Sequence, residues 1–399
     1  TVTVGSSRTI TIDDGATAHF ISGPLTVAST VTGNGSMYMG IISAASPITF
    51  TGAVNTTGAV YIDRNWFASF ASLVDDPSNG PVVLGYNGAI NGSEFRWTGG
   101  AKAFDDRQFV AQNGSRNAIS NFGSGPLTIS RDLGFAGTQT SIPLTLGSPI
   151  SGSDSTGFSN EFAGRIANSP SGTVSVTQVN VGTWILSGAN TYTGTTTLTG
   201  GELAISSDAN ISGTASPLLF QGGTLKVLGT SLTSLNPNRP TTFSGTSASH
   251  AITIGFNIDD AANTFTVGQS IAMATGTGSL TKTGAGTLLL TAANTYTGNT
   301  TISGGVLMLS STAAVSAAAG RSYTVNAAGA VATGFAIDNT FLNRVVQSSV
   351  GAIALGANSA NPLDFNTVTG GTFTAASLGA AGSGTQAYSG VLTPNGTVY

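Results

Sequence analysis

Hydrophobic and polar residues alternate along most of this chain with a period of two, which is the period of a β-strand. Short apolar alternations recur in residues 1–60, at Val2–Val4, Ile10–Ile12 and Leu25–Val27. Turn-forming pairs such as Asp14-Gly15 separate them, and threonine and β-branched residues fill them, as expected of strands with one buried face. The pattern therefore predicts a succession of short β-strands.

A longer segment is repeated within the chain. Gly182–Ile205, GTWILSGANTYTGTTTLTGGELAI, returns as Gly286–Leu309, GTLLLTAANTYTGNTTISGGVLML, and 14 of the 24 positions are identical. Each copy contains an apolar run, the polar turn Ala-Asn-Thr-Tyr-Thr-Gly, a threonine-rich run, a Gly-Gly pair and a second apolar alternation. A strand–turn–strand–turn–strand unit that recurs in this way indicates a repeat architecture.

One such unit cannot bury its apolar face, whereas stacked coils form a continuous core. Coils of about 20–25 residues would give about 16–20 coils in a chain of this length. We predict an all-β fold, a parallel β-solenoid with at most one or two short helices. Its sharp corners require glycine, which tolerates positive φ without steric cost. The Gly-Gly pairs predicted to lie at corners are Gly200-Gly201, Gly222-Gly223, Gly304-Gly305 and Gly370-Gly371.

The sequence divides the predicted solenoid into three regions. Residues 1–60 form N-terminal coils, and residues 61–132, with 13 of the 30 charged residues, form a decorated segment rich in aromatic side chains. Residues 133–399 contain both repeat copies and belong to one continuous rod in this prediction. Apolar residues at helical spacing predict two short helices, in Asn65–Val74 and in Phe335–Val350.

The decorated segment supplies the candidate binding residues. They are Trp66, Tyr86, Arg96 and Trp97, chosen because aromatic and arginine side chains dominate recognition surfaces. One interpretation is a surface that binds a glycan or another subunit. The other is a local thickening of the core, or a decorated loop on the β scaffold. The sequence leaves both open.

Composition narrows the possible functions. Only 8% of the residues are charged and the net charge is −4, so the chain lacks the basic footprint of a nucleic-acid-binding protein. No apolar run approaches about eighteen residues, so no membrane-spanning segment is predicted. Cysteine is absent, and stability would then come from stacking and hydrogen bonding rather than from cross-links. These features fit an extracellular protein of the bacterial cell surface.

Parallel β-solenoids also carry polysaccharide-degrading active sites, so clustered carboxylates need consideration. The cluster rich enough for an acid, a base and a substrate clamp is Asp105-Asp106-Arg107 with Asp75, Asp76 and Arg96. A glycosidase holds two carboxyls about 5–9 Å apart across a groove, whereas adjacent residues on a strand point to opposite faces. We therefore predict solvated turns and no catalytic residues. A polysaccharide lyase or glycosidase is the alternative.

Metal and cofactor binding are not indicated by any motif. His19 and His250 are far apart in the sequence, without the spacing of metal ligands. No calcium-loop motif occurs, although the acidic turns leave a weak calcium site open. We predict neither a metal site nor a cofactor.

The repeated segment resembles the passenger-associated β-strand repeat of bacterial autotransporter-type surface proteins. The core of the resemblance is Asn-Thr-Tyr-Thr-Gly, at Asn190–Gly194 and Asn294–Gly298. The resemblance implies a right-handed parallel β-helix that is secreted, displayed or shed, and that acts in adhesion or as a structural fibre. We expect the two pentapeptides to form coil corners, with Tyr192 and Tyr296 packed along one edge of the rod.

The sequence thus predicts an extracellular structural or adhesive β-solenoid, a rod, stalk or filament subunit. The alternatives are a polysaccharide-degrading enzyme and a glycan-binding adhesin. Strand patterns reach both ends of the sequence, and an uncapped solenoid end invites pairing. The expected partners are therefore further copies stacked end to end, or more of the same chain, together with cell-surface glycans.

Overall fold

The computed structural model describes residues 2–5, 8–21, 24–40, 47–63, 67–86, 93–112, 116–149, 157–213, 215–247, 249–315, 322–366, 372–381 and 385–395. In this part of the chain the protein is a parallel β-solenoid of about 14 turns, which confirms the predicted fold class. It forms two compact units. An N-terminal unit contains residues 1–205 and 209–218, and a C-terminal unit contains residues 206–208 and 219–399.

The coils are fewer than predicted, because several are longer than the period on which that prediction rested. The coil that begins at Leu144 is a long one, since its partner in the next coil is Val176. The following coil is much shorter, because Val176 pairs with Thr196. The additional residues of the long coils lie in the connections between strands.

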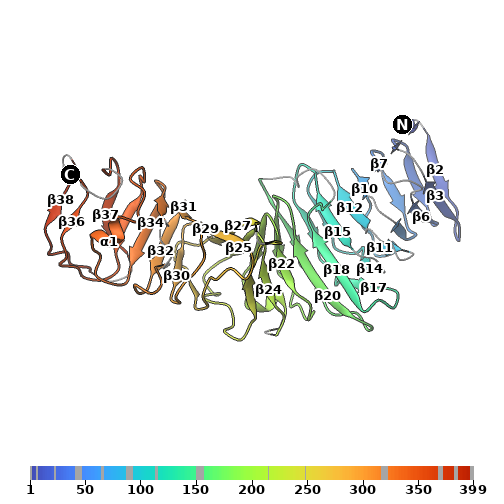
Figure 1. Ribbon diagram of the computed structural model, residues 1–399. Helices are drawn as coiled ribbons and strands as arrows, with labels where there is room; N and C mark the ends of the chain where they lie inside the picture. Colours follow the sequence, from blue (N-terminus) through green and yellow to red (C-terminus); the bar gives the residue numbers. More distant parts are fainter. Residues whose placement is uncertain are drawn as a thin grey trace. The chain divides into compact units, whose positions relative to one another are not determined.

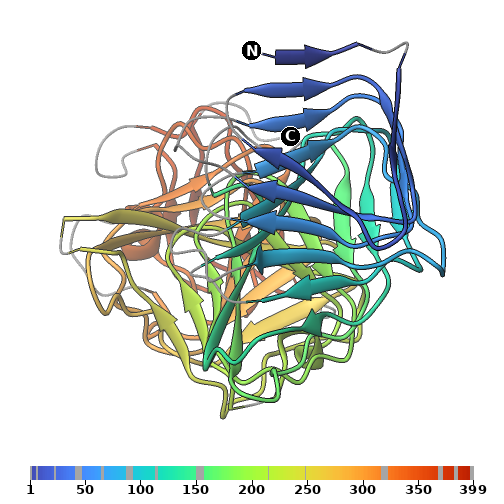
Figure 2. The ribbon, with the colours of Figure 1, turned by 90° about the vertical axis from the view of Figure 1, so that its right-hand side faces the viewer.

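Parallel sheets run along the N-terminal unit, and successive coils add one strand to each (Figures 1 and 2). The longest sheet contains β1 (Val2–Val4), β4 (Leu25–Val27), β7 (Ile48–Phe50), β10 (Phe67–Phe70), β12 (Ser93–Trp97), β15 (Asn117–Asn121), β18 (Ser141–Leu146), β20 (Thr173–Gln178) and β22 (Thr196–Leu198). A second sheet contains β13 (Lys102–Phe104), β16 (Leu127–Ile129), β19 (Ser159–Phe162), β21 (Thr183–Leu186) and β23 (Glu202–Ile205).

The third side of the N-terminal coils changes along the unit. Early coils have a strand there, in the sheet of β3 (Thr17–Ile21), β6 (Ser36–Gly40), β9 (Val60–Asp63), β11 (Val82–Tyr86), β14 (Phe109–Ala111) and β17 (Gly134–Phe135). A small sheet of β2 (Thr9–Ile12), β5 (Thr30–Gly33) and β8 (Val54–Thr56) completes the first coils. The later coils, from β18 on, close their third side without a strand in the described residues. Side chains must then supply hydrogen bonds that a ladder would otherwise make.

The helix predicted for Asn65–Val74 is wrong. Residues 64–66 lie outside the described part, and Phe67–Phe70 form strand β10, which pairs on both sides with β7 and β12. Phe70 is part of a stack of inward-facing rings, with centroids 5.1 Å from Phe50 and 5.3 Å from Phe95. The apolar spacing that suggested a helix therefore serves burial within a coil, and tertiary pairing overrides the local pattern.

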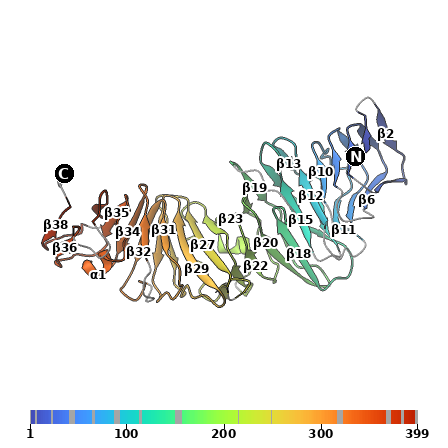
Figure 3. The ribbon, with the colours of Figure 1, turned by 45° about the horizontal axis from the view of Figure 1, so that its top comes forward.

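The C-terminal unit repeats the design on two principal sheets (Figures 1 and 3). One contains β25 (Thr224–Val227), β27 (Ala251–Ile258), β29 (Thr277–Thr283), β31 (Thr300–Ile302) and β33 (Tyr323–Val325). The other contains β28 (Thr264–Val267), β30 (Thr287–Leu290), β32 (Gly305–Leu309), β34 (Gly329–Thr333), β35 (Ala352–Leu355) and β37 (Ser377–Ala380). The remaining strands are β24 (Leu218–Phe220), β26 (Thr241–Phe243), β36 (Leu363–Asp364) and β38 (Leu392–Thr393).

Helical structure is limited to two short turns in the described residues. One is the 3-10 turn η1 (Asp208–Ile211). The other, α1 (Asn339–Leu342), lies inside the predicted segment Phe335–Val350 but is one turn long. Asp338 caps it by accepting a hydrogen bond from the Phe341 backbone N–H at 2.9 Å. Buried Phe341 and Leu342 fix this turn to the core.

Two predicted glycine corners show why glycine is required. Gly201 and Gly305 have φ of 59° and 58°. A Cβ atom there would lie 2.4 Å from the Gly182 carbonyl oxygen and 2.3 Å from that of Gly286. The pair at 222–223 also has positive φ, and the pair at 370–371 lies outside the described residues.

Candidate functional site

The predicted binding residue Arg96 lies in a polar cluster on the outward face of β12. Phe95 and Trp97 on the same strand are core residues, so the alternating residues Glu94 and Arg96 point the other way. The Arg96 Nε donates to the Glu94 Oε1 at 3.1 Å, and its Nη2 donates to the Ser148 Oγ at 3.1 Å. Both charged side chains are buried, with Glu94 fully inaccessible.

Aromatic rings and hydroxyls complete the surroundings of this ion pair. The Arg96 guanidinium carbon lies 3.4 Å from the ring centroid of Phe67 and 4.2 Å from that of Phe122, and such cation–π contacts are favourable. Ser120 donates its hydroxyl to Glu94. A buried ion pair persists when added hydrogen bonds offset its desolvation. The cluster therefore ties three adjacent strands, β10, β12 and β15, together on their outer face.

The other three candidates are placed differently. The indole of Trp97 is 3% exposed, packs against Phe104 with ring centroids 5.8 Å apart, and donates from Nε1 to the Gly100 carbonyl at 2.7 Å. Tyr86 ends β11, with its side chain outside the described structure, as is the whole of Trp66. Among the described side chains, β12 thus places Arg96 and Trp97 on opposite faces.

The acidic segment considered for catalysis forms a backbone-capping arrangement. The Asp75 carboxylate accepts hydrogen bonds from three successive backbone N–H groups, those of Asp105, Asp106 and Arg107. Asp76 caps its own turn, and the hydroxyl and N–H of Ser78 that bond to its side chain lower its pKa. The Asp75 carboxylate is thus occupied in capping backbone N–H groups, which suits a structural turn better than an acid or base.

Arg107 has a role in this segment that sequence reasoning missed. Its guanidinium is fully buried and donates to the carbonyl oxygens of Val74 (3.1 Å), Gly80 (3.0 Å) and Thr56 (2.8 Å). Burial lowers its pKa to about 10, and the neighbouring Asp75 raises it. One buried cation thus joins three successive coils. Its only sequence signal is an arginine beside two aspartates, which resembles an ordinary solvated turn.

The described residues contain neither a cluster of metal-ligand side chains nor a helix long and apolar enough to span a membrane. No group of three or more His, Cys, Asp or Glu side chains gathers there as a metal site would require. In that part of the chain, no helix has the length and apolar character needed to span a bilayer.

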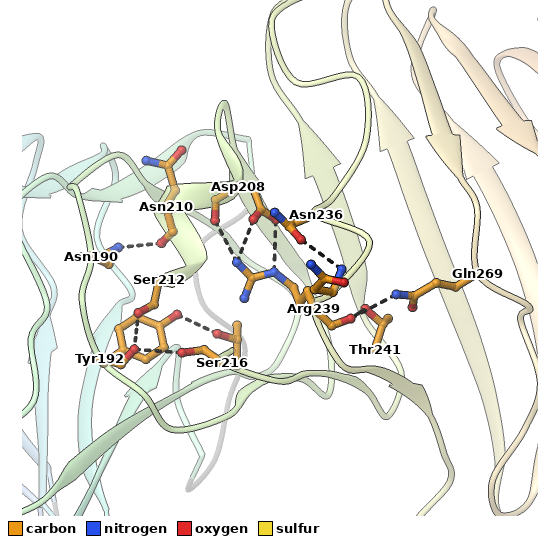
Figure 4. A network of polar contacts seen from close by, with 12 residues as sticks. Asn190, Tyr192, Asp208, Asn210, Ser212, Ser216, Asn236, Arg239, Thr241 and Gln269 are labelled. Atoms are coloured by element: carbon orange, nitrogen blue, oxygen red, sulfur yellow. Dashed lines mark hydrogen bonds and ion pairs between the residues drawn. The ribbon is translucent and has the colours of Figure 1, made fainter. Parts of the chain in front are cut away.

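The Asn-Thr-Tyr-Thr-Gly corners form the second polar site, on the side of the coil that lacks a strand. Asn190 Oδ1 accepts the Ile166 N–H of the preceding coil at 2.7 Å, and its Nδ2 donates to the Asn210 carbonyl of the following coil at 2.6 Å (Figure 4). One side-chain amide therefore replaces both hydrogen bonds of a β-ladder. Asn294 does the same, between Ile271 N (3.0 Å) and Ala314 O (3.0 Å).

The tyrosines of these corners are buried within the coils. Tyr192 and Tyr296 are 0% and 1% exposed, and each hydroxyl lies 2.6 Å from the Oγ1 of the threonine four residues later, Thr196 or Thr300. Ser212 and Ser216 donate to the Tyr192 carbonyl (Figure 4). The expectation that the pentapeptides form corners is met by this geometry.

Lys282, four residues before the second repeat copy, is another buried cation. It is fully buried, and its Nζ donates to the carbonyl oxygens of Thr283 (2.6 Å), Gly284 (2.9 Å) and Gly304 (3.1 Å). Burial lowers its pKa to about 8. Gln178, at the equivalent position of the first copy, donates to the carbonyls of Val179 and Gly182. Each side chain thus donates hydrogen bonds to carbonyl groups at the turn before the next strand.

The segments that contain these corners have counterparts in known proteins. The passenger-associated-transport-repeat family matches residues 176–205 and 280–309, the segments that contain both Asn-Thr-Tyr-Thr-Gly corners. The chain is also 31% identical over 299 residues to the adhesin BmaC autotransporter of Brucella suis biovar 1 (strain 1330). That alignment covers 70% of this chain and 7% of the relative, so the chain spans a small part of the relative's length.

No solved structure gives a significant match to the chain. The repeat match and the adhesin relative indicate a protein of the cell surface or a secreted one. The buried asparagine corners, the parallel solenoid and these two findings together support a relationship to proteins of the autotransporter passenger type.

Proposed function

We propose that this chain is a load-bearing segment of an extracellular adhesive rod, in which stacked coils hold binding surfaces away from the cell. The observation that carries the proposal is that buried polar side chains tie successive coils together at several corners. Asn190 and Asn294 each join three coils at a corner, and Arg107 joins three more. The printed name of the adhesin relative supports the same function.

The mechanical argument rests on the direction of these bonds. Ladder hydrogen bonds run between coils, so a force along the stack acts directly on them. Each contributes only about 0.5–1.5 kcal/mol net, but a coil must break its whole set to separate. Side-chain hydrogen bonds on the side without a strand complete this set of bonds around the coil.

Single-molecule force spectroscopy tests this proposal. The full chain is held between two folded handle domains and stretched. We expect discrete unfolding peaks, with contour-length steps that correspond to whole coils or groups of coils. A chain that extends smoothly, with no peaks above those of the handles, would contradict a load-bearing role. The Asn190→Ala variant provides an internal comparison, because its peaks in the N-terminal unit should occur at lower force.

End-to-end self-association is a separate part of the proposal. Solenoid coils present ladder groups to the next coil, so copies could stack as a heterologous, non-closing assembly. Electron microscopy of the purified chain across a concentration series should then reveal fibres at high concentration. Particles that stay single at every concentration would remove this part and leave the load-bearing role intact.

A glycan-binding adhesin is the second candidate. It is favoured by the printed name of the relative, whereas the Arg96 side chain is buried beneath two phenylalanine rings. The test is a glycan array probed with the wild type and with Trp66→Ala, Tyr86→Ala and Arg96→Lys variants. Binding that weakens in these variants but survives in Arg165→Lys, an exposed arginine paired with Asp132, would support it. No binding across the array would count against it.

The enzyme alternative has the weaker support, because Asp75 is engaged by three backbone N–H groups. It predicts release of oligosaccharides from polysaccharides, lost in Asp105→Asn or Asp106→Asn. Absence of turnover on a panel of acidic and neutral polysaccharides would set it aside.

A further inference from the structure

A cavity of about 410 Å³ opens into the core of the C-terminal unit. The residues that line it include four core rings, each at most 3% exposed: Phe220, Phe243, Phe256 and Phe265. Their centroids are 5.0 Å apart for Phe220 and Phe243, 5.4 Å for Phe220 and Phe256, and 6.4 Å for Phe256 and Phe265. We call this space the phenylalanine cavity. Its volume falls within the range of about 300–1,000 Å³ typical of small-molecule sites.

The topology of the solenoid explains why the core is open here. Strand β28 is the first strand of its sheet, and it pairs fully with β30 on one side only. On the other side it has a single bridge, between Ser234 and Thr266. The inward-facing Val267 is consequently partly exposed, whereas its partner Leu290 in the next coil is fully buried.

The loop over the cavity is firmly anchored. Arg239 is fully buried, and its Nη2 and Nε lie 3.0 and 3.1 Å from the carboxylate oxygens of Asp208 (Figure 4). Its carbonyl oxygen accepts a hydrogen bond from the Gln269 side chain at 3.0 Å. Asn236 and Pro237 begin a turn that the Arg239 N–H closes on the Asn236 carbonyl at 3.0 Å. The cavity is therefore preformed, which spares a ligand the cost of ordering the loop.

The chemistry of the wall restricts the ligand. None of the 13 lining residues is charged, so a charged molecule would lose its hydration without a counter-ion. Phenylalanine rings favour stacked or edge-on contacts with another aromatic ring. Asn236, Thr241 and Gln269 at the rim supply polar groups for one hydrogen-bonding substituent.

From this geometry we propose that the phenylalanine cavity binds small, uncharged aromatic molecules with a single polar group, of the indole or phenol class. The proposal is independent of the load-bearing function, because it rests on the cavity and its lining and not on the ties made by Asn190, Asn294 and Arg107. A solenoid segment would in this way carry a ligand site at the point where a new sheet begins.

Fluorescence titration with N-phenyl-1-naphthylamine, an uncharged aromatic probe, tests the proposal on the full chain. We expect saturable enhancement, displaced by indole. Indole-3-acetate, with the same ring and a carboxylate, should displace the probe at least about tenfold less well, because the cavity offers no counter-ion.

Two substitutions of lining residues fill the cavity, Val267→Phe and Leu235→Phe. Each should weaken probe binding at least about tenfold. Leu235 lies in the partly exposed loop, so this variant remains informative if Val267→Phe does not fold, which circular dichroism will reveal. Val350→Phe is the matched control, since Val350 is 47% exposed and does not line the cavity. The proposal is overturned if the probe shows no saturable binding, or if it binds all variants equally well.

Discussion

The two copies of the repeat lie in different units and have different neighbours, yet their corners keep the same bonds. In the first copy, Asn190 bonds the Asn210 carbonyl, and in the second Asn294 bonds that of Ala314. Asn210 also donates its own side-chain amide to the Ser187 and Gly188 carbonyls, which an alanine cannot do. The shared requirement is therefore a backbone carbonyl at the matched position of the next coil, and the side chain at that position is free to vary.

Gln178 and Lys282 occupy the matched buried position just before the first strand of each repeat copy, and only the lysine can carry a charge. Gln178 and Lys282 both serve nearby carbonyl oxygens, but the lysine must do so at the cost of burying an amine, which lowers its pKa. The comparison indicates that the fold needs a hydrogen-bond donor at this position and tolerates a positive charge there. Substitutions at matched positions of the two copies test this distinction.

The largest effect is expected at the glycine corners. Gly305→Ala places a Cβ 2.3 Å from the Gly286 carbonyl oxygen at a positive φ. We expect it to lower the free energy of unfolding of the C-terminal unit by about 3 kcal/mol or more, as strain and overpacking add. Urea denaturation followed by circular dichroism measures it. Gly304→Ala, where the nearest atom is 3.1 Å away, is the control. Equal losses in both variants would show that the positive φ is not what matters.

The asparagine ties rank second. Asn190→Ala and Asn294→Ala each leave a backbone N–H and a carbonyl without this partner in a buried corner, at a cost of about 2–4 kcal/mol. The loss should be similar in the two units. Asn210→Ala creates the residue type that the second copy has at this position, so it should cost only about 1 kcal/mol. Thermal and urea unfolding provide the values, and an Asn210→Ala loss as large as that of Asn190→Ala would contradict the shared-carbonyl interpretation.

The tyrosine hydroxyls follow. Tyr192→Phe and Tyr296→Phe remove the contact with Thr196 or Thr300, and each should lower the free energy of unfolding by about 1 kcal/mol. A double-mutant cycle with Thr300→Val isolates the pair in the second copy. A coupling energy near zero in that cycle would mean that ring burial alone selects tyrosine.

The last effect concerns pH and only the second copy. The pKa of Lys282 falls from 10.5 to about 8 through burial, so between these pH values the unfolded chain binds more protons than the folded one. Stability of the C-terminal unit should therefore rise from pH 8 to 10.5, by less than about 1.4 kcal/mol per pH unit, the limit for one proton.

Lys282→Gln supplies the control for this pH effect, since it installs the residue of the first copy. The melting temperatures of the two proteins are measured across pH 7–10. If the wild type has the lower melting temperature below pH 8, the difference between the two proteins should shrink as the pH rises. A pH dependence that is unchanged in Lys282→Gln would assign the effect to another group.

Much of the fold could be predicted because its signals are local. The two-residue alternation located β1, β2 and β4, and the Gly-Gly pairs located corners with positive φ at Gly201 and Gly305. The helix predicted for residues 65–74 failed because three apolar residues at helical spacing are also compatible with a strand plus its connections. What decided the outcome was pairing with β7 and β12.

The polar sites were harder to predict, because their partners lie whole coils away. Arg107 was grouped with its acidic neighbours, but its guanidinium bonds carbonyl groups at positions 56, 74 and 80. Arg96 was selected as an exposed candidate, but Glu94 and Ser148 bind it and two rings cover it. Sequence neighbourhood says little about contacts that the coil period creates.

The sequence by itself determined that this chain is a stack of β-coils with asparagine and glycine corners, since strand period, turn residues and the internal repeat are all read locally. Only the tertiary structure decided what fills the third side of each coil, which cations are buried, and where the core opens at the phenylalanine cavity. The reason is physical: those features depend on which residues one coil places against the next. That register is irregular because coil length varies, as the long step from Leu144 to Val176 and the short one from Val176 to Thr196 show.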